Sequence, residues 1–167
     1  MGPLVDEGQL RTVLAYIEIG EKEGARLLCG GKRVGEKGWF VEPTIFGGVR
    51  PDHRLAQEEV FGPVLSIIEA GDFDHALEIA NGVRYGLSSS VYTRDVARAM
   101  RFCERVETGI VHVNSPTVGG EAHLPFGGMK ATGVGEREMG NTAIEFYSQW
   151  KTVYIDYTGA RRTSKVY

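Results

Sequence analysis

The chain has few cysteines: only Cys29 and Cys103 among its 167 residues. Two cysteines cannot build a disulfide framework, and neither lies at the short distance from a histidine that zinc ligands show. We therefore expect no metal site. Cys103 falls at an apolar position of an expected helix and Cys29 follows two leucines, so we interpret both as small core residues and not as nucleophiles.

Long apolar runs and an excess of one charge are also missing. No run approaches the roughly 20 residues of a membrane span, and the first residues have neither the basic nor the apolar part of a signal peptide. There are 19 basic and 22 acidic residues, for a net charge of −3, and the only tight basic group is Arg161, Arg162 and Lys165 at the tail. We expect a cytoplasmic protein with no nucleic-acid or membrane partner.

The length of 167 residues fits one domain with a buried core. An early helix should begin at Asp6, which caps it while Gln9 reaches back. Its inward face has helical spacing, and Gly24 ends it. That face comprises Leu10, Val13, Leu14 and Ile17. Strands are expected over 26–29, 40–46 and 64–68, with Pro43 favouring an edge position for the second.

The middle of the chain alternates helices and strands. Asp72 should cap a helix that ends at Asn81 and Gly82, and strands are expected over 87–92 and 110–114. Between them, Thr93 should cap a helix whose inner face carries Val96, Met100 and Cys103. This rhythm predicts an α/β fold in three layers, a mainly parallel sheet with flanking helices.

The last third begins with a glycine-rich loop over 115–135, a length that is commonly functional. A helix is expected within 136–150 and a strand over 151–157, whose free edge invites pairing with another chain. We therefore divide the chain into residues 1–150 and a terminal strand with its tail, 151–167.

The segment from Gln57 to Ile68 places two carboxylates, Glu58 and Glu59, directly before an apolar strand. Gly62 and Pro63 favour a bend there, and such a bend would hold Glu59 and Phe61 near a strand end, where α/β proteins tend to bind ligands. The alternative is a solvated acidic turn with Phe61 in the core.

The string E-E-V-F-G-P-V at this bend resembles the motif near the nicotinamide end of the cofactor site in NAD(P)-dependent aldehyde dehydrogenases. Further motifs follow in that family's order, and together they are far more specific than any one alone. They are Asn114, Leu124 to Lys130, Thr132-Gly133 and Arg137-Glu138. The resemblance runs from about Gly2 to about Tyr157. The tail from Gly120 through Tyr154 most resembles the α-ketoglutaric semialdehyde dehydrogenase subgroup.

The resemblance implies roles for particular residues. Glu59 matches the carboxylate that accepts hydrogen bonds from the nicotinamide ribose, and Phe61 the aromatic residue packed beside that ribose and ring. Phe126 matches a residue lining the aldehyde pocket, although a loop-anchoring core role is the open alternative. For Asn114 and Glu138 we expect structural hydrogen bonds.

The reaction that the resemblance implies needs a cysteine thiolate, a hydride acceptor and a carboxylate that activates water. Neither cysteine stands in the family's G-Q-x-C context, and no G-x-G-x-x-G follows a strand. The chain therefore resembles the C-terminal third of such an enzyme, and we expect no catalytic residue in it and no activity from it alone.

The implied ligands are NAD or NADP and an aldehyde, more narrowly a semialdehyde, and the terminal strand implies a homo-oligomer. The other hypothesis is a non-catalytic α/β module that serves assembly. The histidines show no catalytic pattern: we expect His53 and His75 at the surface, His112 in a strand and His123 in a loop.

Overall fold

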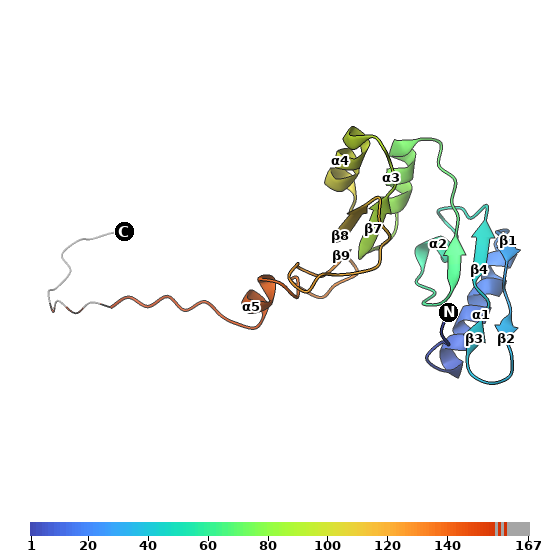
Figure 1. Cartoon of the computed structure of the whole chain (residues 1–167), viewed down its shortest axis with the longest axis horizontal. Helices are drawn as coiled ribbons and strands as arrows, with labels where there is room; N and C mark the ends of the chain where they lie inside the picture. The colour runs from blue at the N-terminus through green and yellow to red at the C-terminus, as the bar shows by residue number, and fades with distance from the viewer. Residues whose placement is uncertain (156, 158, 160–167) are drawn as a thin grey trace.

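A computed structural model describes residues 1–155, 157 and 159 of the chain. Two packed parts follow one another, and the chain then runs away from both beyond its last helix (Figure 1). Within the described residues, no helix has the length and apolar character needed to cross a bilayer.

The first part contains two helices and five strands: α1 (Glu7–Lys22), β1 (Arg26–Cys29), β2 (Arg33–Val34), β3 (Phe40–Val41), β4 (Thr44–Gly47), α2 (Arg54–Gln57) and β5 (Val64–Ser66). The second part and the segment after it contain the remaining elements: α3 (Phe73–Asn81), β6 (Tyr85–Gly86), β7 (Ser88–Val91), α4 (Val96–Arg105), β8 (Ile110–Val113), β9 (Met129–Lys130) and α5 (Thr142–Phe146).

Helix α1 follows the sequence prediction closely. The Asp6 carboxylate accepts a hydrogen bond from the Gln9 backbone N–H at 2.7 Å, and Gly24 leaves the helix with φ 88°. Its buried face carries Leu10, Val13 and Ile17. Only the return contact from the Gln9 side chain was predicted wrongly, because that side chain bonds elsewhere.

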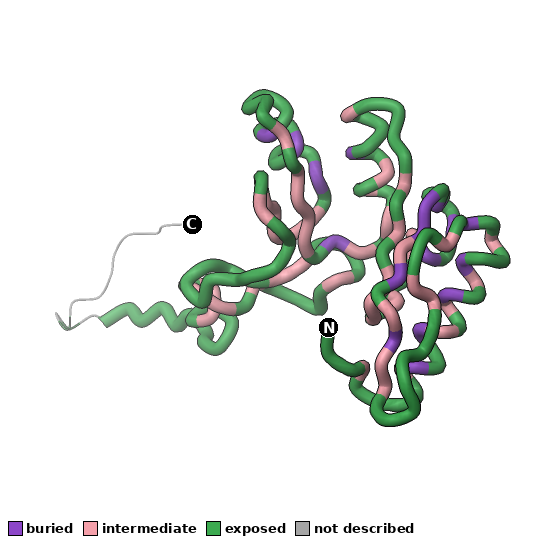
Figure 2. The backbone as a smooth tube through the Cα atoms, turned by 45° about the vertical axis from the view of Figure 1, so that its right-hand side comes forward, coloured by how far each residue is buried: buried purple, intermediate pink, exposed green. Residues whose placement is uncertain are grey.

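The larger core lies where α1 packs on β4, whose Phe46 is completely buried. Most of the buried positions of the described chain lie in this first part (Figure 2). A smaller core in the second part joins Leu77 of α3 to Phe102 and Val106 at the end of α4. Helices α3 and α4 lie together beside β7 and β8 (Figure 1).

Among the residues that the structure describes, the strands form four small sheets and not one. The first has the order β1-β4-β5 and the others are pairs: β2-β3, β6-β9 and β7-β8. Only β4-β5 and β7-β8 are parallel, so three of the five pairings are antiparallel. The prediction of one mainly parallel sheet was therefore wrong for the described residues, and the three-layer arrangement stays a prediction.

Pro43 is the physical reason for one of these differences. The strand expected over 40–46 divides at Glu42 and Pro43, because proline has no backbone N–H for the ladder. Strand β3 then joins β2, while β4 pairs on both sides and becomes the central strand of its sheet. The expected edge position was wrong.

Helix α4 turns a different face inward from the one predicted. Asp95, and not Thr93, caps the helix by accepting from the N–H groups of Ala97 and Arg98. The buried residues are Ala99 and Phe102, a face with the same helical spacing but a larger aromatic ring to bury. The predicted inner face is exposed: Val96, Met100 and Cys103.

Cys29 is exposed as well as Cys103, so the interpretation of both cysteines as core residues was wrong. His53 was also placed wrongly: it is 2% exposed, at the start of α2, where its Nδ1 accepts from the Arg50 N–H at 3.4 Å. His75 is exposed, His112 lies in β8, and His123 lies in a loop, as predicted.

The C-terminal region is less regular than expected. The glycine-rich loop includes β9, which pairs with β6, and the helix expected within 136–150 is confined to the five residues of α5. Residues 151–155 form no strand, since a strand needs a pairing partner along its length. Residues 156, 158 and 160–167 of the predicted strand and tail lie outside the described residues.

Candidate functional site

The bend between α2 and β5 keeps the two residues singled out by the sequence at the surface. Glu59 is exposed, and the Phe61 side chain is 74% exposed. Phe61 also has φ 51°, in the left-handed region that residues with a Cβ rarely adopt. The alternative that buries Phe61 in the core is therefore wrong.

One face of helix α1 contacts this bend through hydrogen bonds and close packing. The Gln9 side-chain amide donates to the carbonyls of Val60 at 2.9 Å and Phe61 at 3.1 Å. Four residues on, Val13 packs so closely on Gly62 that a Cβ there would lie 2.5 Å from its Cγ2. Three residues further, the Tyr16 hydroxyl donates to Glu58 at 2.5 Å. Successive turns of α1 therefore fix the bend.

The two adjacent carboxylates have different surroundings. Arg54 donates from Nε to Oε1 of Glu58 at 2.9 Å and from a terminal nitrogen to Oε2 at 2.7 Å, and its guanidinium lies 5.3 Å from the centre of the Tyr16 ring. The hydrogen bonds from Arg54, and then from Tyr16, lower the pKa of Glu58 to about 2. In turn, the hydrogen bond to Glu58 raises the pKa of Tyr16.

Glu59, by contrast, makes no side-chain hydrogen bond or ion pair with the described residues. Its carboxylate oxygens can accept hydrogen bonds from a ligand's hydroxyl groups. Phe61 presents a flat apolar ring close by in sequence, on backbone that Gln9 holds. A carboxylate acceptor and an apolar ring two residues apart can contact a ligand that carries both hydroxyl groups and a flat ring.

Phe126 lies elsewhere, in the wall of a cavity of about 440 Å³ whose lining includes neither Glu59 nor Phe61. The other lining residues come from β8 and the glycine before it, from the loop after β8, and from Met139: Gly109, Ile110, Val111, His112, Val118, Gly119, Gly120, Glu121, Leu124, Pro125 and Met139. Phe126 is held by two backbone hydrogen bonds with Glu138, at 2.6 and 2.9 Å. The structure thus gives Phe126 a cavity, and its role toward an aldehyde stays a prediction.

Asn114 and Glu138 hold loops, as expected. The Asn114 side chain accepts from the Thr93 N–H at 2.8 Å and donates to the Thr93 carbonyl at 2.9 Å, joining the ends of β7 and β8. Glu138 acts through its backbone, by the bridge to Phe126. Next to it, Arg137 donates to the Gly128 carbonyl and closes the L-P-F-G-G loop.

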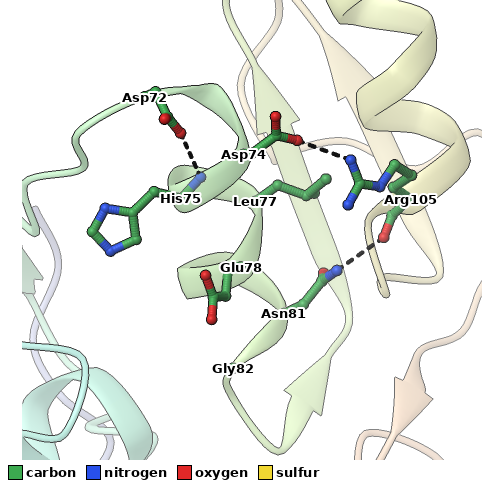
Figure 3. Close-up of a pocket in the computed structure, with 8 residues that line it drawn as sticks. All are labelled: Asp72, Asp74, His75, Leu77, Glu78, Asn81, Gly82 and Arg105. Carbon is green, nitrogen blue, oxygen red and sulfur yellow. Dashed lines mark hydrogen bonds and ion pairs between the residues drawn. The ribbon is translucent and has the colours of Figure 1, made fainter.

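A second cavity, of about 700 Å³, is lined by α3 and the end of α4 (Figure 3). Its charged and polar groups are largely used for packing. Asp74 pairs with Arg101 and Arg105, and the hydrogen bond from Arg101 lowers the pKa of Asp74. The Asn81 side chain donates to the Arg105 carbonyl at 2.9 Å, and Asp72 caps α3. We therefore assign this cavity to the structure of the helix pair.

Comparison with known proteins identifies the group to which the chain belongs. A model of the "Aldehyde dehydrogenase family" matches residues 1–153. The chain belongs to the aldehyde dehydrogenase family. This finding agrees with the resemblance of the E-E-V-F-G-P-V bend and confirms the α/β class.

Three relatives show how far the likeness reaches. Over 155 residues the chain is 50% identical to 2,5-dioxopentanoate dehydrogenase of Saccharolobus solfataricus, covering 92% of this chain and 32% of that protein. It is 51% identical over 162 residues to alpha-ketoglutarate semialdehyde dehydrogenase of Haloferax volcanii, covering 94% and 34%. A crystal structure of an NAD-dependent aldehyde dehydrogenase from Sinorhizobium meliloti superposes with a TM-score of 0.91 at 37% identity, covering 98% and 32%. The chain spans about a third of the length of the relatives it matches.

The sequence alone did not predict the α1 residues that hold the E-E-V-F-G-P-V bend in place. From the sequence, Gln9 is predicted to take part in a helix cap and Tyr16 has no predicted role. A signal for both existed, because Gln9, Val13 and Tyr16 are spaced i, i+4 and i+7 and share a helix face. What the sequence could not show is that this face meets a bend more than 40 residues away.

Proposed function

We propose that this chain supplies the nicotinamide-facing part of an NAD(P)-dependent aldehyde dehydrogenase that oxidises an aldehyde to a carboxylic acid. Glu59 accepts hydrogen bonds from the nicotinamide ribose, and Phe61 restricts the position of the ring. Phe126 lines the aldehyde pocket. When bound, the nicotinamide supplies the hydride acceptor of the reaction. The observation that carries the proposal is the exposed Glu59–Phe61 pair on a bend fixed to α1.

The two residues act on the ligand in different ways. The Glu59 carboxylate has no competing partner among the described residues, so its acceptor capacity is open to ribose hydroxyls. The Phe61 ring offers an apolar surface that favours one face of a flat heterocycle and keeps water from it. Neither residue performs a bond-making step.

The proposed substrate is a semialdehyde, and in particular α-ketoglutarate semialdehyde. The proposal is supported by the names of the two relatives near 50% identity, since 2,5-dioxopentanoate is the systematic name of that compound. The cavity beside Phe126 is mostly apolar, with His112 and Glu121 as its ionisable groups.

We further propose that the 167-residue chain does not oxidise aldehydes by itself. Cys29 lies on β1 and Cys103 on the exposed face of α4, and neither stands in a G-Q-x-C sequence. The test is NAD(P)H production by the pure chain with the semialdehyde, for which we expect a rate equal to the blank. Clear turnover would overturn the assignment of the nucleophile to residues outside this chain.

The positive test uses a graft, in which residues 1–153 of this chain replace the matching third of the Saccharolobus solfataricus relative. Because the two are 50% identical there, we expect the graft to fold and to oxidise α-ketoglutarate semialdehyde with NAD⁺ or NADP⁺. A folded graft that binds neither cofactor would refute the proposed function.

A second proposal concerns assembly, and the exposed aromatic residues after α5 favour it. Trp150 is 92% exposed and Tyr154 84% exposed, on a segment that pairs with no strand among the described residues. We propose that residues 151–157 pair with a strand of another copy, so that the chain forms a homo-oligomer. Deleting residues 151–167 should lower the mass measured by light scattering, and an unchanged mass would refute this role.

A further inference from the structure

We propose that Gln9 is a positioning residue that sets the cofactor-facing bend before a ligand arrives, by holding Phe61 in its left-handed backbone conformation. This inference rests on the proposed function and adds to it a residue that lies outside the E-E-V-F-G-P-V motif. Gln9 lies about 50 residues away in sequence and reaches the bend from α1.

The geometry of the contact is specific. A glutamine amide nitrogen carries two hydrogens, and Nε2 of Gln9 donates to two successive carbonyls, Val60 at 2.9 Å and Phe61 at 3.1 Å. Drawing both carbonyls toward one nitrogen constrains the peptide plane between them. That plane is flanked by the φ of Phe61, which stands at 51°. A phenylalanine rarely takes this value without an external restraint.

Nothing in a packed core holds the Phe61 side chain, since it is 74% exposed. Its direction therefore follows from its backbone, and the same holds for the exposed Glu59. Two other contacts from α1 hold the flanks of the bend, Tyr16 to Glu58 on one side and Val13 to Gly62 on the other. Gln9 is the α1 side chain bonded to the backbone between them.

The restraint has a stable base. Gln9 lies in the first turn of α1, where its backbone N–H donates to the capping Asp6 carboxylate, and its neighbours Leu10 and Val13 are buried in the main core. A side chain on such a helix has few alternative positions, so its hydrogen bonds fix the bend relative to the core.

The first experiment measures the bend itself in the full 167-residue chain by NMR. In the native chain the Phe61 N–H should have an order parameter of about 0.85, with chemical shifts of positive φ. In Gln9→Glu, which keeps the shape but has no donor, the order parameter should fall below about 0.6 and the shifts should move toward extended values. Gln9→Leu should do the same without a charge. Unchanged Phe61 signals in either folded variant would overturn the proposal.

Ala15→Glu is the matched control, because Ala15 lies on the exposed face of the same helix. It adds the same carboxylate without touching the bend, and the Phe61 signals should stay as in the native chain. A change as large as that in Gln9→Glu would mean that charge on α1, and not the lost donor, loosens the bend. That result would overturn the proposal.

The second experiment asks whether the hold matters for the cofactor, using the graft. Gln9→Glu should raise KM for NAD⁺ at least fivefold while kcat changes less than twofold, and Ala15→Glu should change neither. A loosened bend with an unchanged KM would refute the positioning role. A native-sequence graft that binds no cofactor would refute the proposed function instead, and the NMR result would still decide whether Gln9 holds Phe61.

Discussion

Gly62 is the position where the bend presses hardest on helix α1, and Gly62→Ala is the substitution that tests this contact. The added Cβ would lie 2.5 Å from Cγ2 and 3.2 Å from Cγ1 of Val13. Carbon atoms in favourable contact lie about 3.5–4.0 Å apart, so the methyl group is about 1 Å too close. Val13 is completely buried and β-branched, so it cannot turn away. We expect a loss of about 1–3 kcal/mol of unfolding free energy.

Urea denaturation followed by far-UV circular dichroism measures this loss. With a slope of about 2 kcal/mol per molar urea, the midpoint should fall by about 0.5–1.5 M at an unchanged slope. Gly71→Ala is the matched control, because Gly71 lies on the other side of β5 and the atom nearest to its added Cβ would be the His75 Nδ1 at 3.7 Å, an ordinary contact. It should stay within about 0.5 kcal/mol of the native chain.

A double-mutant cycle with Val13→Ala identifies the clashing partner. Removing the two Val13 methyl groups opens the space, so in that background Gly62→Ala should cost less than about 0.5 kcal/mol and the coupling should reach about 1 kcal/mol or more. Additive effects of the two substitutions would refute the close packing of the bend on α1 and, with it, the account of how α1 fixes Phe61.

Three further predictions address the charges, the exposed ring and the second part of the chain. The pKa of Glu58 is about 2 in the folded chain against a usual 4.5. The stabilisation of the fold by the ionised Glu58 carboxylate is therefore complete above pH 4.5 and is lost as the pH falls toward 2. The difference in unfolding free energy between the native chain and Glu58→Gln, measured by urea titrations, should shrink over that interval. Phe61→Ala should leave stability within about 0.5 kcal/mol, because the ring is 74% exposed, yet raise KM for NAD⁺ in the graft. Gly109→Ala should cost about 3 kcal/mol or more, seen in near-UV circular dichroism, because its Cβ would lie 1.8 Å from the Gly127 carbonyl oxygen, a backbone atom.

Local signals predicted the first part of the fold well. The Asp6 cap, the apolar spacing of α1 and the stop at Gly24 all act within a few residues, and the structure confirms them. Pairing between strands depends on distant segments, so the sheets were predicted less well. Helix α4 shows the same limit, because two faces had helical spacing and only the packing of Phe102 against Leu77 decides between them.

The candidate site shows where sequence reasoning ends. Two adjacent glutamates are chemically alike, and only the bend at Gly62-Pro63 and the family resemblance favoured Glu59 over Glu58. The structure supplies a physical difference. Arg54 and Tyr16 both donate hydrogen bonds to the Glu58 carboxylate, whereas the Glu59 carboxylate has no partner among the described residues. Tyr16 lies 42 residues before Glu58, and no local pattern predicts that contact. His53 was misplaced for the same reason, because its burial depends on tertiary packing and not on its polarity.

The dissociation constant of NAD⁺ from the graft, compared between Glu59→Gln and Glu58→Gln, tests the central claim most directly. A hydrogen bond to a charged group contributes about 1.5–3 kcal/mol, so Glu59→Gln should weaken binding by about 10- to 150-fold. Glu58→Gln keeps an acceptor for Tyr16 and Arg54 and should change binding less than threefold. Native affinity in Glu59→Gln, or equal losses in both variants, would contradict the assignment of Glu59 to the cofactor.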